Sequence, residues 1–289
     1  MTKTKIRFTP LDAVLIVLIV AATAYFVRRI GVEMDYRWQW PVILQYIVRT
    51  DGGSWAAGSL AQGFLTTVRL SLWATVLATL LGTILGIMRV SHSLFCRMIA
   101  GGYVELVRNL PPLVLVFIAY FFIGERIMTL LGAEGVIRSA SPEMQEFLAV
   151  LFSPPARLSG FFAGLATLVL YEAAYITEIV RAGIQSIEPG QWEAAHALGL
   201  SRLQQLRFVI LPQALQTILP ALGGQLISTI KDSAIVSVIS IPELTFQGLE
   251  LMSATYLTFE VWITITALYF ILTFTFSLGV RRLEFRMRK

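Results

Sequence analysis

The sequence has few charged residues, one cysteine and two histidines, and each shortage excludes a class of protein. Charged residues make up 14% of the 289 positions and hydrophobic residues 56%, whereas a soluble domain carries about 25% charged residues. The single cysteine, Cys96, excludes an intrachain disulfide and a cysteine-rich metal site. His92 and His196 lack the spacing of metal ligands. The composition therefore predicts an integral membrane protein without a metal centre.

Signatures of catalysis are also missing. The sequence has no G-x-x-x-x-G-K-[ST] phosphate loop, so ATP chemistry is not expected in this chain. No nucleophile and base share a recognisable pattern, and no acid–base pair shares one depth in the apolar runs. We therefore predict no catalytic residue and no cofactor, and the alternative of a membrane-embedded enzyme lacks a site.

Basic residues are in excess, with a net charge of +5, but their positions argue against nucleic acid as a partner. Five of the 23 Lys and Arg residues lie in the tail at 281–289, and three more lie at 3–7, before the first apolar run. Basic clusters that flank apolar runs are typical of the cytoplasmic ends of membrane spans.

The longest apolar runs contain no Asp, Glu, Lys or Arg. Two of them, Val209–Ile230 and Val261–Val280, are each long enough to cross about 30 Å of hydrocarbon. The first run fits either a retained anchor or a cleaved signal peptide, and its length and the following Arg28-Arg29 favour the anchor. Altogether we predict six spans, at 11–30, 60–88, 104–123, 159–183, 208–230 and 258–281.

The fifth span is rich in helix breakers. It carries Pro212, Pro220 and Gly223-Gly224, and proline removes a backbone donor and clashes with the preceding turn. Broken helices occur at membrane depth where protein or water satisfies the freed groups, as in transport pathways. A kinked packing helix is the alternative interpretation.

Between the fourth and fifth spans, local signals predict a polar hairpin of two short helices. Pro189 suits a first helical turn, and a helix is expected over Gln191–Leu198. Gly199 suits the left-handed position just past its end. Ser201 with Gln204 forms a capping box for the second helix. A hairpin in this place lies at the membrane surface and is accessible to a soluble partner. The alternative, a helix lying on lipid, favours Lys and Arg on its polar face, and the first helix has none.

One pattern in this hairpin resembles a known family. Glu193-Ala194-Ala195 is followed after three residues by Gly199, and after nine more by Val209 and then Leu211-Pro212. This pattern resembles the EAA motif of ABC importer permeases, which has Ile where this chain has Val209. Four further segments, at 63–72, 103–113, 174–186 and 231–244, resemble permeases for polar amino acids, so the resemblance covers about residues 60–281.

The resemblance implies an all-α, polytopic membrane helical bundle in the bacterial inner membrane, with a five-helix importer core at 60–281 and the EAA loop at 187–212. The apolar runs add an N-terminal helix, which gives about six transmembrane helices. Six spans and the modest excess of Lys and Arg in the loops placed inside predict that both termini are cytoplasmic. Residues 1–59, outside the resemblance, are then an N-terminal anchor and a periplasmic segment, and residues 282–289 are a basic cytoplasmic tail.

The resemblance also implies partners. A second permease subunit, alike or different, pairs with this one in the membrane lipid, and a periplasmic binding protein delivers the amino acid solute. An ABC ATPase subunit supplies the ATP chemistry. The residues implied to couple to that ATPase are Glu193, Ala194, Ala195, Gly199, Leu211 and Pro212.

Ionisable residues at membrane depth are costly and are functional candidates. Arg69, Glu172, Lys231 and Asp232 are the candidates for a translocation pathway. Glu172 lies in mid-span, and two hypotheses stay open for it. It contacts a cationic group of the solute, or it is a buried partner for Arg69 or Lys231.

Two further charged pairs predict structural ion pairs, because Glu178 and Arg181, and likewise Glu105 and Arg108, are three residues apart in expected helices. Two other functions also stay open. A permease for another small solute, such as an opine, a compatible solute or a sulfur compound, has the same loop. A plain structural anchor leaves the hairpin and the proline-rich span unexplained.

Overall fold

The structure is a computed structural model that describes residues 10–33, 36–51, 54–124, 126, 130, 135 and 139–287. The chain divides into two compact units, Met1–Ile43 and Leu44–Lys289. The first unit contains α1 (Pro10–Glu33), whose apolar side chains are mostly exposed. Among the described residues, its apolar part is Pro10–Phe26. Helix α2 (Trp40–Ile47) follows.

The second unit opens with an antiparallel hairpin and continues almost entirely as helix. Strands β1 (Val48–Asp51) and β2 (Ser54–Ala57) pair with Thr50 opposite Trp55. The helices are α3 (Ser59–Arg89), α4 (Leu94–Asn109), α5 (Pro112–Ile118), η1 (Ala119–Gly124), α8 (Pro142–Leu151), η2 (Pro155–Arg157), α9 (Leu158–Gln185), α10 (Pro189–Ala197), α11 (Arg202–Gln204), η3 (Gln205–Ile210), α12 (Leu211–Asp232), η4 (Ser233–Ile239), α13 (Leu244–Thr255) and α14 (Thr258–Met287).

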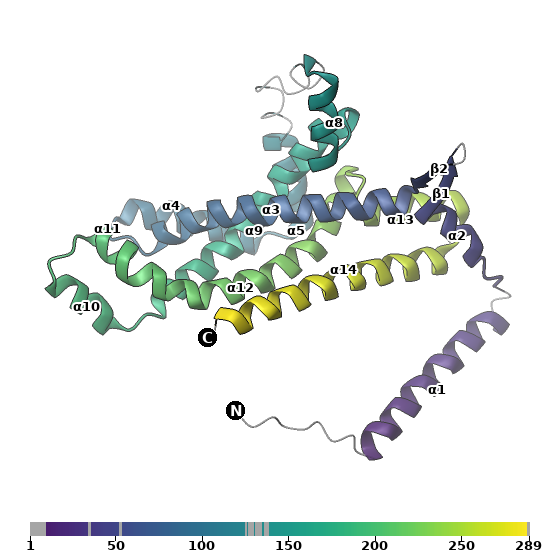
Figure 1. The fold of residues 1–289 in the computed structure, drawn as a ribbon, viewed down its shortest axis with the longest axis horizontal. Coiled ribbons are helices and arrows are strands. Elements are labelled where there is room, and N and C mark those ends of the chain that lie inside the picture. Colours follow the sequence, from purple (N-terminus) through teal and green to yellow (C-terminus); the bar gives the residue numbers. More distant parts are fainter. Residues whose placement is uncertain are drawn as a thin grey trace. The chain divides into compact units, whose positions relative to one another are not determined.

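The prediction of an all-α membrane bundle is confirmed, with a smaller number of straight spans. Among the described residues, four helical stretches are long and apolar enough to cross a membrane, and five if one bent pair counts as a span. The four are Ser59–Arg89, Pro155–Gln185, Arg202–Ile239 and Thr258–Arg286. Figure 1 shows α3, α9, α12 and α14 running alongside one another, with the α10–α11 hairpin at one end and the β hairpin at the other.

The predicted third span at 104–123 is not one straight helix. Helix α4 begins at Leu94, within a stretch expected to be a loop, and α4 and the helix after it meet at 118°. The break lies at Leu110, whose backbone is extended (φ −87°, ψ 145°). Its cause is the pair Pro111-Pro112, because a residue before proline is pushed out of the α-helical region.

Helix α9 forms the centre of the second unit and packs closely on α3. Gly82 and Gly86 of α3 face Ile176 and Val180 of α9 so closely that a Cβ built at Gly86 would lie 2.7 Å from the Val180 Cβ. A side chain at either glycine would therefore separate the two helices.

Most helix breakers of the fifth span lie inside one continuous helix. Pro212 lies in the first turn of α12, and Pro220 and the two glycines lie inside an α-helix that continues to Asp232. The irregular turns are the π-helix η3 before it and the 3₁₀-helix η4 after it. Of the two interpretations, a helix broken at mid-span is therefore not observed, because α12 is one α-helix from Leu211 to Asp232 with Pro220 inside it.

Candidate functional site: a coupling hairpin and a buried polar cluster

The local structure of the hairpin at 187–212 confirms the sequence signals. Helix α10 begins at Pro189 and ends at Ala197, and Gly199 has the left-handed conformation (φ +74°). The Gln204 Oε1 accepts a hydrogen bond from the Ser201 N–H at 2.8 Å, as a capping box requires. The start and end signals in the sequence therefore define both short helices.

One face of this hairpin is anchored to the membrane helices. Ala195 is buried, and Leu206 and Ile210 of η3 join the same apolar cluster as Ile184 of α9 and Ile218 of α12. The Gln213 side chain also donates to the Gln191 Oε1 at 3.1 Å, which ties the start of α10 to α12. Because of these contacts, a force on the hairpin reaches both spans that flank it.

The other face is open. Glu193, Ala194, Gly199 and Pro212 are exposed, and Leu211 is half-buried. Three large apolar side chains on the hairpin are also exposed: Leu198 by 78%, Leu203 by 74% and Phe208 by 62%. Apolar exposure beside polar residues marks a binding surface. Of the six predicted coupling residues, therefore, Ala195 is buried, Leu211 packs against the anchoring cluster and the other four are exposed.

Glu172 lies at the centre of a buried polar cluster between α9 and α12. Its side chain is fully buried, and its Oε2 accepts a hydrogen bond from the Gln225 Nε2 at 2.7 Å. Its Oε1 is buried and has no hydrogen-bond partner within the part of the chain that the structure describes. Thr229 and Asp232 lie beside it. Two carboxylates with a spare acceptor form a site suited to an ammonium or guanidinium group.

The hypothesis that Glu172 is a buried partner of Arg69 or Lys231 is wrong. Its hydrogen-bond partner is the side-chain amide of Gln225, and neither cation forms an ion pair with any residue in the described ranges. Lys231 is exposed and Arg69 half-exposed. The structure therefore brings together two of the four pathway candidates, Glu172 and Asp232, and leaves the two cations outside that cluster.

Sequence reasoning missed Gln225 and Thr229. A signal was present, since Gln225, Thr229 and Asp232 are spaced i, i+4, i+7 and so form one polar stripe on an otherwise apolar helix. No local signal specifies that this stripe faces Glu172, which is 53 residues away from Gln225.

The comparisons with known proteins agree with this architecture. The family model described as binding-protein-dependent transport system inner membrane component matches residues 78–289. The chain belongs to this family. It is therefore a permease subunit of a multi-pass membrane transport system, and the family implies an ATPase and a solute-binding protein as partners.

Two sequence relatives and one structure extend the match. The probable glutamine ABC transporter permease GlnM of Bacillus subtilis (strain 168) is 32% identical over 228 residues, which cover 79% of this chain and 93% of the relative. The nopaline transport system permease NocM of Agrobacterium fabrum is 32% identical over 212 residues, covering 73% and 80%. A crystal structure of an amino acid ABC transporter with histidines has a TM-score of 0.66 and 32% identity, covering 87% of this chain and all of that one.

The two predicted ion pairs of this permease have different outcomes. Glu178 accepts from Arg181 at 2.7 Å, as expected, and also pairs with Arg89 of α3 at 3.0 Å. The predicted pair of Glu105 with Arg108 is wrong. The Glu105 carboxylate accepts from Asn109 at 3.0 Å, and the Arg108 guanidinium lies over the Tyr175 ring at 5.6 Å. Tyr175 is on α9, so Arg108 contacts a residue of another helix and not the neighbouring Glu105 of its own helix.

Proposed function

We propose that this permease carries amino acids through the inner membrane by alternating access and is driven by its ATPase partner through the hairpin at 187–212. The observation that carries the proposal is the two-faced hairpin. Its buried face joins α9 and α12, and its open face presents Glu193, Ala194 and the exposed Leu198. A lever needs both a stiff attachment and a free surface for the partner.

The coupling step follows from this geometry. Closure of the ATPase pair on ATP displaces the hairpin, and the contacts of Trp192, Leu206 and Ile210 carry that displacement into α9 and α12. These two helices hold Glu172 and Gln225, so the same movement changes the solute cluster. A solute shifts the equilibrium between outward and inward states only through its different affinity for them.

An amino acid is the solute class that the relatives and the cluster favour together. Two of the three proteins compared carry glutamine or amino acid in their names. Every amino acid has an ammonium group, which the spare Glu172 oxygen and the adjacent Asp232 complement. An opine is the second candidate, favoured by the similarity to a nopaline permease.

The remaining parts of the proposal concern assembly. The permease pairs with a second permease subunit, alike or different, and both termini are cytoplasmic. Residues 60–281 form the importer domain, residues 1–59 add an anchor and a periplasmic segment, and residues 282–289 form a basic tail. The hairpin lies at the opposite end of the second unit from the β hairpin (Figure 1), which supports one docking face on each side of the membrane.

Transport is tested with the complete complex in proteoliposomes, with its binding protein and ATP present. We expect ATP-dependent uptake of at least one radiolabelled amino acid from a full panel. Uptake of an opine alone would select the second candidate. Absence of ATP-dependent uptake for every amino acid and opine would refute the proposal.

Docking is tested by cross-linking in a Cys96→Ser background. Leu198→Cys, on the open face of the hairpin, is expected to cross-link to the ATPase subunit. Trp55→Cys is the matched control, because Trp55 is 81% exposed on the β hairpin at the other end. Cross-linking from position 55 and none from position 198 would reverse the proposed orientation.

A further inference from the structure

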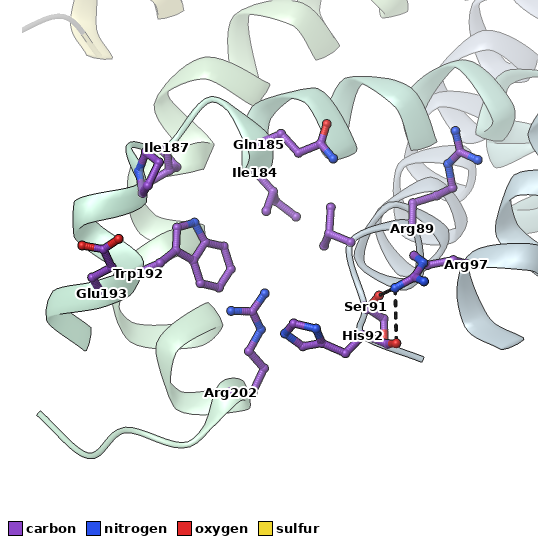
Figure 2. A pocket seen from close by; sticks show the side chains of 12 residues that line it. Arg89, Ser91, His92, Arg97, Ile184, Gln185, Ile187, Trp192, Glu193 and Arg202 are labelled. Atoms are coloured by element: carbon purple, nitrogen blue, oxygen red, sulfur yellow. Dashed lines mark hydrogen bonds between the residues drawn. The ribbon is translucent and has the colours of Figure 1, made fainter. Parts of the chain in front are cut away.

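A recess of about 560 Å³ lies where the turn between α3 and α4 faces the hairpin. Arg89, Arg97, Arg202 and His92 line it, and Glu193 is the single carboxylate among its described lining residues. Figure 2 shows Arg202 and His92 pointing toward one another across the recess, whereas the Glu193 side chain lies at its edge and points away. The recess is therefore basic.

Its arginines are held in place and keep unused donors. The Arg97 Nη1 donates to the Ser91 and His92 carbonyls at 3.1 and 3.2 Å, which fixes the guanidinium at the wall. The Arg202 guanidinium stacks on Trp192 at 3.9 Å and donates one long hydrogen bond from its Nη1 to the Gln205 Oε1 at 3.5 Å, so its other N–H groups can still donate. The Arg89 guanidinium is already paired with Glu178 at 3.0 Å, so the donors available to a ligand come from Arg97 and Arg202. Fixed guanidinium groups with spare N–H donors suit a phosphate group.

The recess lies at the level of the membrane surface. Arg89 is the last residue of the span Ser59–Arg89, and Gln185, which also lines the recess, is the last residue of the span Pro155–Gln185. Two spans thus end at its rim. Phospholipid headgroups occupy this depth, and basic pockets between spans bind anionic headgroups.

Exposed apolar side chains follow the recess along α4 and provide a surface for acyl chains. The first turns of α4 expose Leu94 by 63%, Phe95 by 72% and Met98 by 65%, and Arg97 lies among them in the sequence. Inorganic phosphate has no apolar part that could contact such a surface, whereas a phospholipid places its acyl chains against it.

We propose that this recess binds the phosphate headgroup of an anionic phospholipid, with its acyl chains against the exposed residues of α4. The lipid then bridges α4 and the hairpin, because Arg97 belongs to the first and Arg202 to the second. This inference goes beyond the proposed function and holds for any solute. Its consequence is that anionic lipid stiffens the hairpin on which the ATPase acts.

The test uses the complete purified complex in nanodiscs of phosphatidylcholine with or without phosphatidylglycerol. Native mass spectrometry counts the retained phosphatidylglycerol, and we expect Arg97→Gln/Arg202→Gln to lower that retention about tenfold. Arg281→Gln is the matched control, since Arg281 is an exposed arginine near the end of the α14 span and outside the recess. It is expected to retain the lipid.

Three outcomes would overturn the proposal. Equal retention in wild type and the double variant removes the recess as the site. Displacement of phosphatidylglycerol by millimolar inorganic phosphate identifies a free anion as the ligand. Retention that depends on removal of the ATPase subunit identifies the recess as part of the protein interface. If the double variant fails to assemble, the single variants are measured, and each is expected to lower retention at least threefold.

Discussion

Glu172 in the middle of α9 and Glu243 before α13 are both fully buried, yet their surroundings differ. Three donors reach the Glu243 Oε2: the Tyr269 hydroxyl at 2.8 Å, the Thr245 N–H at 2.9 Å and the Thr67 hydroxyl at 3.3 Å. The Phe246 N–H reaches its Oε1 at 2.8 Å. Glu172 accepts one hydrogen bond and keeps one buried oxygen without a partner in the described part of the chain.

This difference separates a structural carboxylate from a candidate ligand site. Glu243 begins α13 and bonds to α3 and α14, so it fastens three elements together. Glu172 has one bond, to a neighbouring span, and its free oxygen costs stability unless something binds there. Burial alone therefore does not identify a ligand site, whereas burial of a carboxylate together with an oxygen that has no partner makes Glu172 a candidate for one.

The largest expected effect is that of Glu243→Ala. The change leaves two backbone N–H groups and two hydroxyls without their acceptor, at a cost of about 3 kcal/mol. We expect a markedly lower Tm of the purified complex. Glu172→Ala is the matched comparison and is expected to lower the Tm far less, because it frees a single amide. Equal loss of stability in both variants would contradict the contrast between these residues.

A second prediction applies the same contrast to neighbouring residues of the hairpin. Ala195→Leu overpacks the buried face and costs about 1–3 kcal/mol. Ala194→Leu changes only the exposed face, so the permease itself keeps its Tm while ATPase binding weakens. Tm measurements with and without the ATPase subunit distinguish the two. A Tm loss for Ala194→Leu without the ATPase would show that both alanines are buried.

These contrasts also show what sequence can and cannot predict. The hairpin was predictable residue by residue, because Pro189, Gly199 and the Ser201–Gln204 pair act on their immediate neighbours. The helix break before Pro111 could have been predicted from the same kind of local signal, although a straight span was expected at 104–123.

Contacts between helices were not predictable in this way. Glu172 stood out as an ionisable residue in an apolar run, but its partner depends on how α12 turns against α9. The predicted partners Arg69 and Lys231 were wrong for that reason. Arg108 is a second example of a contact between helices that the sequence did not predict, because its side chain lies over Tyr175 of α9 and not beside Glu105. Periodicity identifies the polar face of a helix and leaves open which helix that face meets.

A third prediction sharpens the assignment of Glu172 to the solute. Glu172→Gln keeps the size and an acceptor for Gln225 but removes the charge, so assembly and Tm are expected to persist. Loss of a charge-assisted hydrogen bond to an ammonium group lowers apparent affinity about tenfold. Uptake assays over a range of solute concentrations measure it. Unchanged affinity and selectivity would remove Glu172 from the pathway.

The smallest expected effect is a pH dependence of stability to which the Glu243 carboxyl contributes. Burial raises the pKa of the Glu243 carboxyl from 4.5 to about 7, although its hydrogen bonds oppose this shift. The folded state then holds the proton more tightly than the unfolded state. The stabilisation is complete below pH 4.5 and is lost as pH rises through 7.

We expect the Tm of the complex to fall slightly between pH 5 and pH 8. Glu243→Gln cannot titrate and is expected to lack this part of the slope, while it keeps one oxygen acceptor for the surrounding donors. If the wild type and Glu243→Gln have parallel Tm profiles, the four hydrogen bonds outweigh burial and Glu243 is charged throughout this range. In that case its contrast with Glu172 rests on hydrogen-bond satisfaction alone, which the alanine pair measures independently.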